Sequence, residues 1–212
     1  RDRYVDAVVL PDRALPVVTS ELGAGPTPGD VVQARRALEM ARHAMLDGAA
    51  AGGDALVRVW EVATGRELFT VGGFPEQVWS AVFSPDGSWL LLAQIAGGGS
   101  PNPIVVRLSE HKFVDVLSGF QATVLSLRFS SDGKKLVTAS ADGKVRIWSV
   151  PGWQLLETLS GHKGPVRWAE FSPDGNWVVS GGEDETVRVW SADDGKLVQT
   201  LSESHAPIDT VA

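Results

Sequence analysis

A ten-residue motif occurs three times in this chain of 212 residues, and this recurrence is the strongest constraint on its fold. The three copies span residues 78–87, 124–133 and 166–175. Each copy ends in Asp-Gly, and the aspartates at 86, 132 and 174 are separated by 46 and 42 residues. A period of this length is typical of a fold in which each repeat is one small supersecondary unit.

Short apolar runs follow the Asp-Gly pairs and predict β-strands. Trp89–Ala93, Leu136–Ala139 and Trp177–Ser180 come directly after the three turns, and Val145–Trp148 and Val187–Trp190 follow 42 residues apart. Apolar runs of this length, bounded by Asp-Gly or Gly turns, are typical of antiparallel hairpins. Each period therefore predicts four short antiparallel strands, and the chain is expected to be all-β.

The last complete repeat resembles a WD repeat. Gly161-His162, Phe171–Gly175, Ser180–Asp184 and Val187–Trp190 carry this resemblance at fixed offsets. It implies a β-propeller, a ring of four-stranded blades around a central channel. The blades are expected at about 4–71, 77–117, 123–159 and 165–201. Strand alternation predicts a core formed by Val9, Ala81, Phe83, Leu127, Phe129, Val137, Ile147, Phe171, Val179 and Val189, with Trp60, Trp148 and Trp190.

Residues 205–212 resemble 162–169 and predict the first strand of a further blade. Four blades and one strand are fewer than the family usually has, so we expect a partial propeller. Remaining blades or a second copy of the chain would then close the ring, because an open ring leaves sheet edges exposed. The alternative is a closed ring of four blades with one overhanging strand.

The first repeat is longer than the others, and the excess at 21–53 predicts a helical insertion in the first blade. Leu15–Ser20 is expected to form the second strand of that blade, and Ala49–Gly53 a flexible return. Asp30 is a suitable helix N-cap, and apolar residues recur at helical spacing between 31 and 45. The helix either docks on the propeller or binds a partner through the arginines that lie off its apolar stripe: Arg35, Arg36 and Arg42.

The resemblance implies a hydrogen-bond network that stabilises a blade. In WD repeats a loop Asp bonds a His, the His bonds a hydroxyl, and that hydroxyl meets the indole N–H of a Trp. The complete set here is His162, Ser180, Asp184 and Trp190. The other repeats depart from it: the third has Thr138, Asp142 and Trp148 with Phe120 in place of the His, the first has Asp54 and Trp60 with Thr19 or Ser20, and the second has Phe74 and Leu108 in place of the His and the Trp.

Composition excludes several kinds of chemistry. The chain has no Cys, which rules out disulfides, thiolate metal sites and Cys nucleophiles. Its four His are scattered without metal-ligand spacing, so no metal, cofactor or catalytic residue is expected. The run Glu183–Glu185 is interpreted as a structural Asp between solvated carboxylates rather than as a metal or acid–base site.

Charge and hydropathy restrict the partners. The net charge of −7 disfavours nucleic acid, since phosphate binding needs a basic field. No apolar run approaches the length of a membrane span and no signal peptide is visible, so we expect a cytoplasmic protein.

We therefore expect a non-enzymatic scaffold that presents loops to a protein or peptide partner within a complex. In the family one face of the propeller commonly carries the binding sites. The residues expected to contact the partner are Trp79, Gln121, Leu125, Lys163, Arg167 and the three helix arginines, Arg35, Arg36 and Arg42. The alternative is that the chain is the regulatory or targeting propeller of a larger enzyme whose catalytic domain lies outside it, because fold alone does not fix function.

Overall fold

The computed structural model describes residues 4–8, 48–52, 57–61, 66–72, 78–95, 102–110 and 112–201. The described residues form sixteen β-strands and no helix. The predicted all-β class is confirmed for this part of the chain.

The strands form four sheets of four antiparallel strands each, in chain order within every sheet. The first sheet contains β1 (Tyr4–Val8), β2 (Gly48–Gly52), β3 (Val57–Glu61) and β4 (Arg66–Val71). The second contains β5 (Val78–Phe83), β6 (Trp89–Gln94), β7 (Ile104–Arg107) and β8 (Lys112–Val116). The third contains β9 (Val124–Phe129), β10 (Lys135–Ser140), β11 (Lys144–Ser149) and β12 (Leu155–Ser160). The fourth contains β13 (Val166–Phe171), β14 (Trp177–Gly182), β15 (Val187–Ser191) and β16 (Leu197–Leu201).

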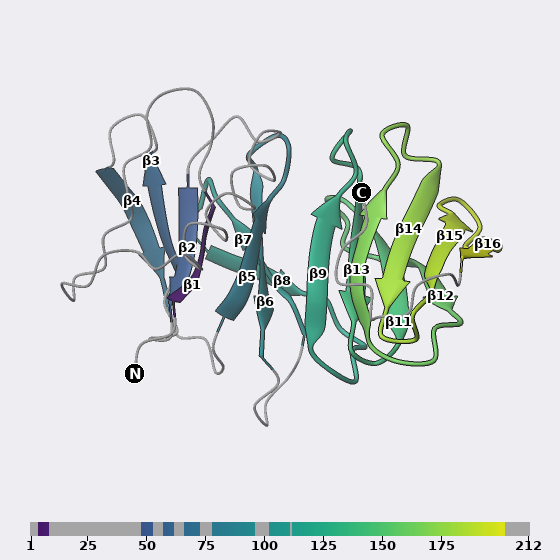
Figure 1. Ribbon diagram of the computed structural model, residues 1–212. Coiled ribbons are helices and arrows are strands. Elements are labelled where there is room, and N and C mark those ends of the chain that lie inside the picture. The colour runs from purple at the N-terminus through teal and green to yellow at the C-terminus, as the bar shows by residue number, and fades with distance from the viewer. Residues whose placement is uncertain are drawn as a thin grey trace.

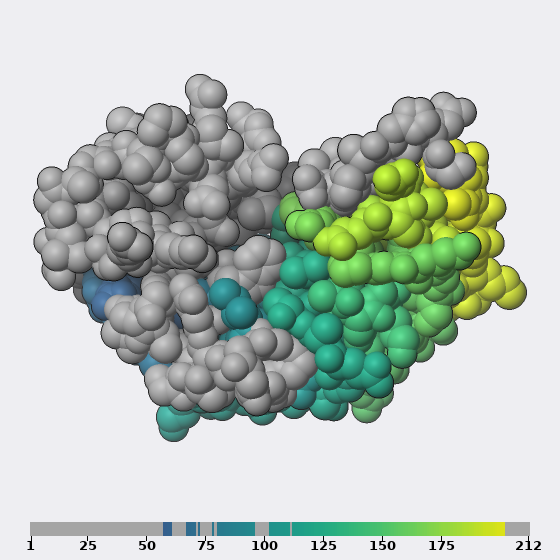
Figure 2. Space-filling view, turned by 60° about the horizontal axis from the view of Figure 1, so that its bottom comes forward, coloured from purple at the N-terminus to yellow at the C-terminus, as the bar shows by residue number. Residues whose placement is uncertain are grey.

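The sheets follow one another in chain order and meet at their first strands. β1 contacts β5, β5 contacts β9, and β9 contacts β13. Figure 1 shows the first sheet at one side, the third and fourth at the other, and the second between them. The last strands lie on the outside: every residue of β8 and β16 is exposed, and β16, yellow in Figure 2, lies at the margin of the molecule. This arrangement agrees with that of consecutive propeller blades.

Apolar side chains fill the space between each pair of neighbouring sheets. Val57 and Val59 of the first sheet pack with Leu90, Leu92 and Val106 of the second, and all five are at most 1% exposed. Equivalent clusters join the second sheet to the third and the third to the fourth. Full burial of one such side chain contributes roughly 1.5–3 kcal/mol, so face-to-face packing of the sheets is the main source of stability.

The recurring Asp-Gly motif forms the turn between the first and second strands of a sheet. In the third sheet Ser130 Oγ donates to Asp132 (2.7 Å), and the same oxygen accepts from the backbone N–H of Lys135 (2.9 Å). Asp132 also accepts from the N–H of Lys134 (3.0 Å), while Gly133 has a φ of +69°, which favours glycine. The equivalent Ser–Asp bonds recur at Ser84–Asp86 and Ser172–Asp174. The short-range chemistry of this motif therefore explains its recurrence.

The prediction for the first repeat was wrong at its second strand. Gly48–Gly52 is not a flexible return but strand β2, which pairs with both β1 and β3. It takes the position that we assigned to Leu15–Ser20, so the extra residues separate the first strand from the second rather than the second from the third. Glycine and alanine are poor strand formers, which hid this strand from pattern analysis. Gly48 pairs with Trp60, so a small residue stands opposite a large one.

Several predicted features lie outside the described residues. They are the helix expected before Gly48, with Arg35, Arg36 and Arg42, and the further strand at 205–212. In the part of the chain that the structure describes, there is no helix with the length and apolarity needed to cross a membrane.

Candidate functional site

A buried chain of hydrogen bonds links the loop before β13 to the two central strands of the fourth sheet. His162 Nδ1 lies 2.8 Å from Asp184 Oδ1, and His162 Nε2 lies 2.8 Å from Ser180 Oγ. Trp190 Nε1 donates to Ser180 Oγ over 2.9 Å. The structure thus brings together all four residues that the resemblance singled out in this repeat.

The bonding pattern fixes the tautomer of His162. Ser180 Oγ accepts the indole N–H of Trp190, so its own hydrogen is available for Nε2 of the imidazole. Nδ1 therefore carries the ring proton and donates it to Asp184. A neutral imidazole satisfies both neighbours.

Burial and hydrogen bonding shift the pKa values of both titratable groups. Burial lowers the pKa of His162 below its ordinary 6.5, although the hydrogen bond and charge of Asp184 oppose that shift. Burial alone would raise the pKa of Asp184, but hydrogen bonds from the Lys163 N–H, from His162 and from Thr186 outweigh it and lower that pKa to about 2. The carboxylate is therefore charged and the imidazole neutral near pH 7.

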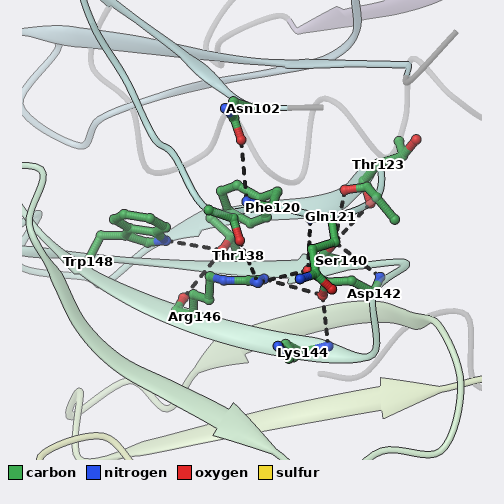
Figure 3. A network of polar contacts seen from close by, with 12 residues as sticks. Asn102, Phe120, Gln121, Thr123, Thr138, Ser140, Asp142, Lys144, Arg146 and Trp148 are labelled. Carbon is green, nitrogen blue, oxygen red and sulfur yellow. Dashed lines mark hydrogen bonds and ion pairs between the residues drawn. The ribbon is translucent and has the colours of Figure 1, made fainter. Parts of the chain in front are cut away.

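The third sheet has a related network without a histidine. Trp148 Nε1 donates to Thr138 Oγ1 over 3.1 Å, the same bond that Trp190 makes in the fourth sheet. Phe120 fills the histidine position and stacks on Trp148, with 5.7 Å between ring centroids and 28° between planes. Figure 3 shows these rings beside Thr138 and Asp142.

Arg146 takes the place of the imidazole as the partner of the aspartate. Its guanidinium donates to the two carboxylate oxygens of Asp142 over 2.8 and 3.3 Å and to the Gly119 carbonyl over 2.9 Å. It lies 4.5 Å from the centroid of the Phe120 ring, and both Arg146 and Asp142 are only 4% exposed (Figure 3). Burial would raise the pKa of Asp142, but the Arg146 guanidinium and the Gln121 N–H together lower it.

Sequence reasoning overlooked this arginine. An Arg stands two positions before the Trp in three repeats, at Arg58, Arg146 and Arg188. That recurrence was the available signal. In the fourth sheet Arg188 lies farther from the carboxylate, with 3.8 Å between its Nη2 and Asp184 Oδ2, because His162 occupies the space between them and the indole.

The second sheet corrects one assignment. Leu136 pairs with Trp148 in the third sheet, and its counterpart 46 residues earlier, Leu90, pairs with Val106. Val106 therefore stands at the tryptophan position, where we predicted Leu108. The register, and not the nearest large residue, determines this equivalence.

The first sheet lacks the hydroxyl of the network. Ala50 pairs with Arg58 as Thr138 pairs with Arg146, so an alanine stands where the hydroxyl is needed. Trp60 is half-buried in β3. Asp54, Thr19 and Ser20 lie outside the described residues.

Both aspartates also fix the backbone of the loops that enter the sheets. Asp184 accepts from the N–H of Lys163 over 2.9 Å, and Asp142 accepts from the N–H of Gln121 over 3.3 Å. The side chains of Lys163 and Gln121 are exposed. We call this side of the third and fourth sheets, residues 119–123, 141–143, 161–165 and 183–185, the network edge. Its backbone is held by buried bonds while its side chains face solvent.

The other residues expected to bind a partner are placed differently. Arg167 is exposed in β13 and its Nη2 lies 2.6 Å from Glu183 Oε1 beside the network edge. Leu125 is half-buried in β9. Trp79 belongs to β5, and its side chain lies outside what the structure describes.

The acidic run Glu183–Glu185 divides into separate roles. Glu183 pairs with Arg167, Asp184 belongs to the buried network, and Glu185 is exposed. Among the residues that the structure describes, no three His, Asp or Glu side chains lie close enough together to hold a metal ion.

Comparison with known proteins identifies related repeats. The family "WD domain, G-beta repeat" matches residues 111–149 and 153–191, which include most of the third and fourth sheets. WD repeat-containing protein SL1-17 of Schistosoma mansoni is 33% identical over 94 residues, which are 44% of this chain and 30% of that protein. Small ribosomal subunit protein RACK1 of Candida albicans is 28% identical over 110 residues (48% and 33%), and Target of rapamycin complex subunit wat1 of Schizosaccharomyces pombe is 30% identical over 101 residues (47% and 31%). The matches span about a third of the length of these three relatives.

Proposed function

We propose that this chain, a WD-repeat protein, is a non-enzymatic scaffold that holds a protein or peptide partner at its network edge, within a larger complex. The observation that carries the proposal is the pairing of fixed backbone with exposed side chains. Asp142 and Asp184 hold the loops at Gln121 and Lys163 by buried hydrogen bonds, while both side chains face solvent. A surface ordered before binding loses less conformational entropy when a partner arrives.

Charge gives this edge a character of its own. Lys163 and Arg167 are exposed cations on a chain whose net charge is −7, and Glu183 lies within ion-pair distance of Arg167. An acidic group on a partner can approach Lys163 directly and compete with Glu183 for Arg167. Exposed ion pairs contribute little to stability, so such an exchange costs little in the fold.

The relatives support a role in assemblies. Two of them are named as a ribosomal subunit protein and as a subunit of the target of rapamycin complex. By analogy we infer a protein-bound scaffold in the cytoplasm for this chain. Arg35, Arg36 and Arg42, outside the described residues, remain a second proposed contact surface.

The experiment is selection of ligands followed by charge reversal. Peptides that bind the full chain are isolated from a random display library, and their affinities are measured by calorimetry for the parent and for Lys163→Glu/Arg167→Glu. We expect about a tenfold or larger loss of affinity, as for removal of central charged contacts. The matched control is Lys134→Glu, an exposed lysine at the opposite end of the third sheet. Ligands that are indifferent to the double variant but sensitive to the control would contradict the proposal.

A further inference from the structure

The face of the third sheet that looks toward the fourth is completely covered. Val137, Val145 and Ile147 are 0% exposed and Leu159 is 1% exposed. These four side chains belong to one cluster with Val166, Ala169 and Phe171 of strand β13. An apolar face of this kind is therefore buried by the first strand of the next sheet.

The fourth sheet repeats this face on its outer side. The counterparts 42 residues later are Val179, Val187, Val189 and Leu201. Their register is the same, since Val179 pairs with Val189 and Val187 with Leu201. Yet the three valines are only half-buried and Leu201 is 48% exposed. No core cluster of the described chain includes these four side chains.

The sequence after β16 contains a segment that fits this face. Pro207 and Ile208 repeat Pro165 and Val166 at the same separation of 42 residues, and Val211 repeats Ala169. Val166 and Ala169 are the two residues of β13 that are 0% exposed.

The reach of the connection is also the same. Seven positions separate Leu159 from Val166, and seven separate Leu201 from Ile208. A loop that carries the chain from β12 to the inner edge of the fourth sheet has the length needed to carry it from β16 to the next inner edge.

We propose that the outer face of the fourth sheet is an interaction surface whose occupant is residues 207–211 of the same chain. Ile208 and Val211 pack on Val179, Val187 and Val189 as the side chains of β13 pack on the third sheet. This surface is separate from the network edge, so the inference does not depend on the proposed function. Large apolar faces left in water favour association, and the occupant removes that exposure.

Cysteine reactivity tests the proposal, because the chain has no Cys of its own. The full-length variant Val187→Cys places a thiol on the face in question. Val145→Cys supplies a buried reference and Thr200→Cys an exposed one. Rates of reaction with a small aromatic disulfide are measured for each, alone and combined with Ile208→Asp/Val211→Asp.

We expect the Val187→Cys thiol to react at least about tenfold more slowly than the Thr200→Cys thiol in the otherwise unchanged chain. The Ile208→Asp/Val211→Asp change should bring its rate to within about threefold of the exposed reference. A Val145→Cys thiol that stays slow in this background shows that the third sheet is still folded. The matched control is Asp209→Lys, at the position that corresponds to exposed Arg167, and it should leave the Val187→Cys rate unchanged.

Three outcomes would overturn the proposal. The first is a Val187→Cys thiol as reactive as the exposed reference before any change at 208 and 211. The second is a slow rate that persists in the aspartate double variant. The third is a slow rate that becomes fast on dilution, which would assign the face to a second copy of the chain.

Discussion

Phe120 and His162 occupy the same position in successive repeats, 42 residues apart, and each ring lies against the tryptophan of its sheet. The Phe120 ring centroid is 5.7 Å from that of Trp148, and the His162 centroid is 6.3 Å from that of Trp190. The phenyl ring stacks at 28°, whereas the imidazole is tilted by 51°. Both rings fill the space beside the indole, but only the imidazole can also bond the aspartate. Arg146 makes that bond in the third sheet.

Arg146→Ala should destabilise the protein by about 3–5 kcal/mol, because it leaves a buried carboxylate without its charged partner. The matched variant Arg188→Ala should cost no more than about 1 kcal/mol. Asp184 keeps its bonds to His162, Thr186 and the Lys163 N–H after that change. Urea unfolding of both variants measures the difference. Equal losses would contradict the different roles of the two arginines.

His162→Phe copies the third sheet and should cost about 1–3 kcal/mol, since Asp184 and Ser180 each lose a partner. Arg188 is close enough to replace part of that loss, with 3.8 Å between Nη2 and the carboxylate. His162→Phe/Arg188→Ala should therefore cost more than the sum of the single changes, by at least about 0.5 kcal/mol. A double-mutant cycle in urea gives this value. Strict additivity would mean that Arg188 does not move to the aspartate.

Acidification should weaken the fourth sheet in two steps. The pKa of His162 is below 6.5 in the fold, so the unfolded chain binds more protons and stability decreases as pH falls below about 6.5. The pKa of Asp184 is about 2 against an ordinary 3.8, so a second loss follows as pH falls from about 4 toward 2. Unfolding free energies of the parent and His162→Phe between pH 7.5 and 5 test the first step. The variant should show a flatter profile, and an identical slope would contradict the assignment.

Glu185→Gly should stabilise the protein by about 1 kcal/mol. Glu185 has a φ of +61°, a left-handed conformation that costs a side chain roughly 1–2 kcal/mol. Gly143 holds the same place one repeat earlier with a φ of +79°. The reverse change Gly143→Ala should destabilise, since its Cβ would also lie 3.2 Å from the Gly164 carbonyl oxygen. Thermal unfolding compares the two, and a lower midpoint for Glu185→Gly would contradict the strain.

Trp190→Ala should destabilise by about 3–5 kcal/mol, as expected for a large buried aromatic residue. Trp190 is 2% exposed and donates its indole N–H to Ser180. Trp177 in the same sheet is 41% exposed, and Trp177→Ala should cost about 1 kcal/mol or less. Chemical unfolding measures both. A loss below about 1 kcal/mol at Trp190 would exclude a structural role for the indole.

Much of the fold could be predicted because short-range chemistry recurs with it. Asp-Gly turns and apolar runs locate twelve strands of the last three sheets, and the offsets of His162 and Asp184 from Trp190 predict which side chains meet. Strand β2 was missed because alanine and glycine carry no apolar pattern. Arg146 was missed because its role depends on an absence elsewhere, the imidazole that Phe120 replaces.

Burial was predicted well only where a neighbour is present. Val137 and Ile147 are fully buried as expected, whereas Val179 and Val189 on the equivalent face of the fourth sheet are half-buried. Strand alternation identifies the apolar side of a strand but not what packs on it. That second fact comes from the order of the sheets.

The second sheet keeps the strand order of its neighbours with a valine, Val106, at the tryptophan position. Its aliphatic contacts with Val57 and Val59 suffice to seat it. What evolution must preserve at this point is a shape, and not an indole. Surveys that count signature aromatics will credit proteins of this kind with fewer sectors than they contain.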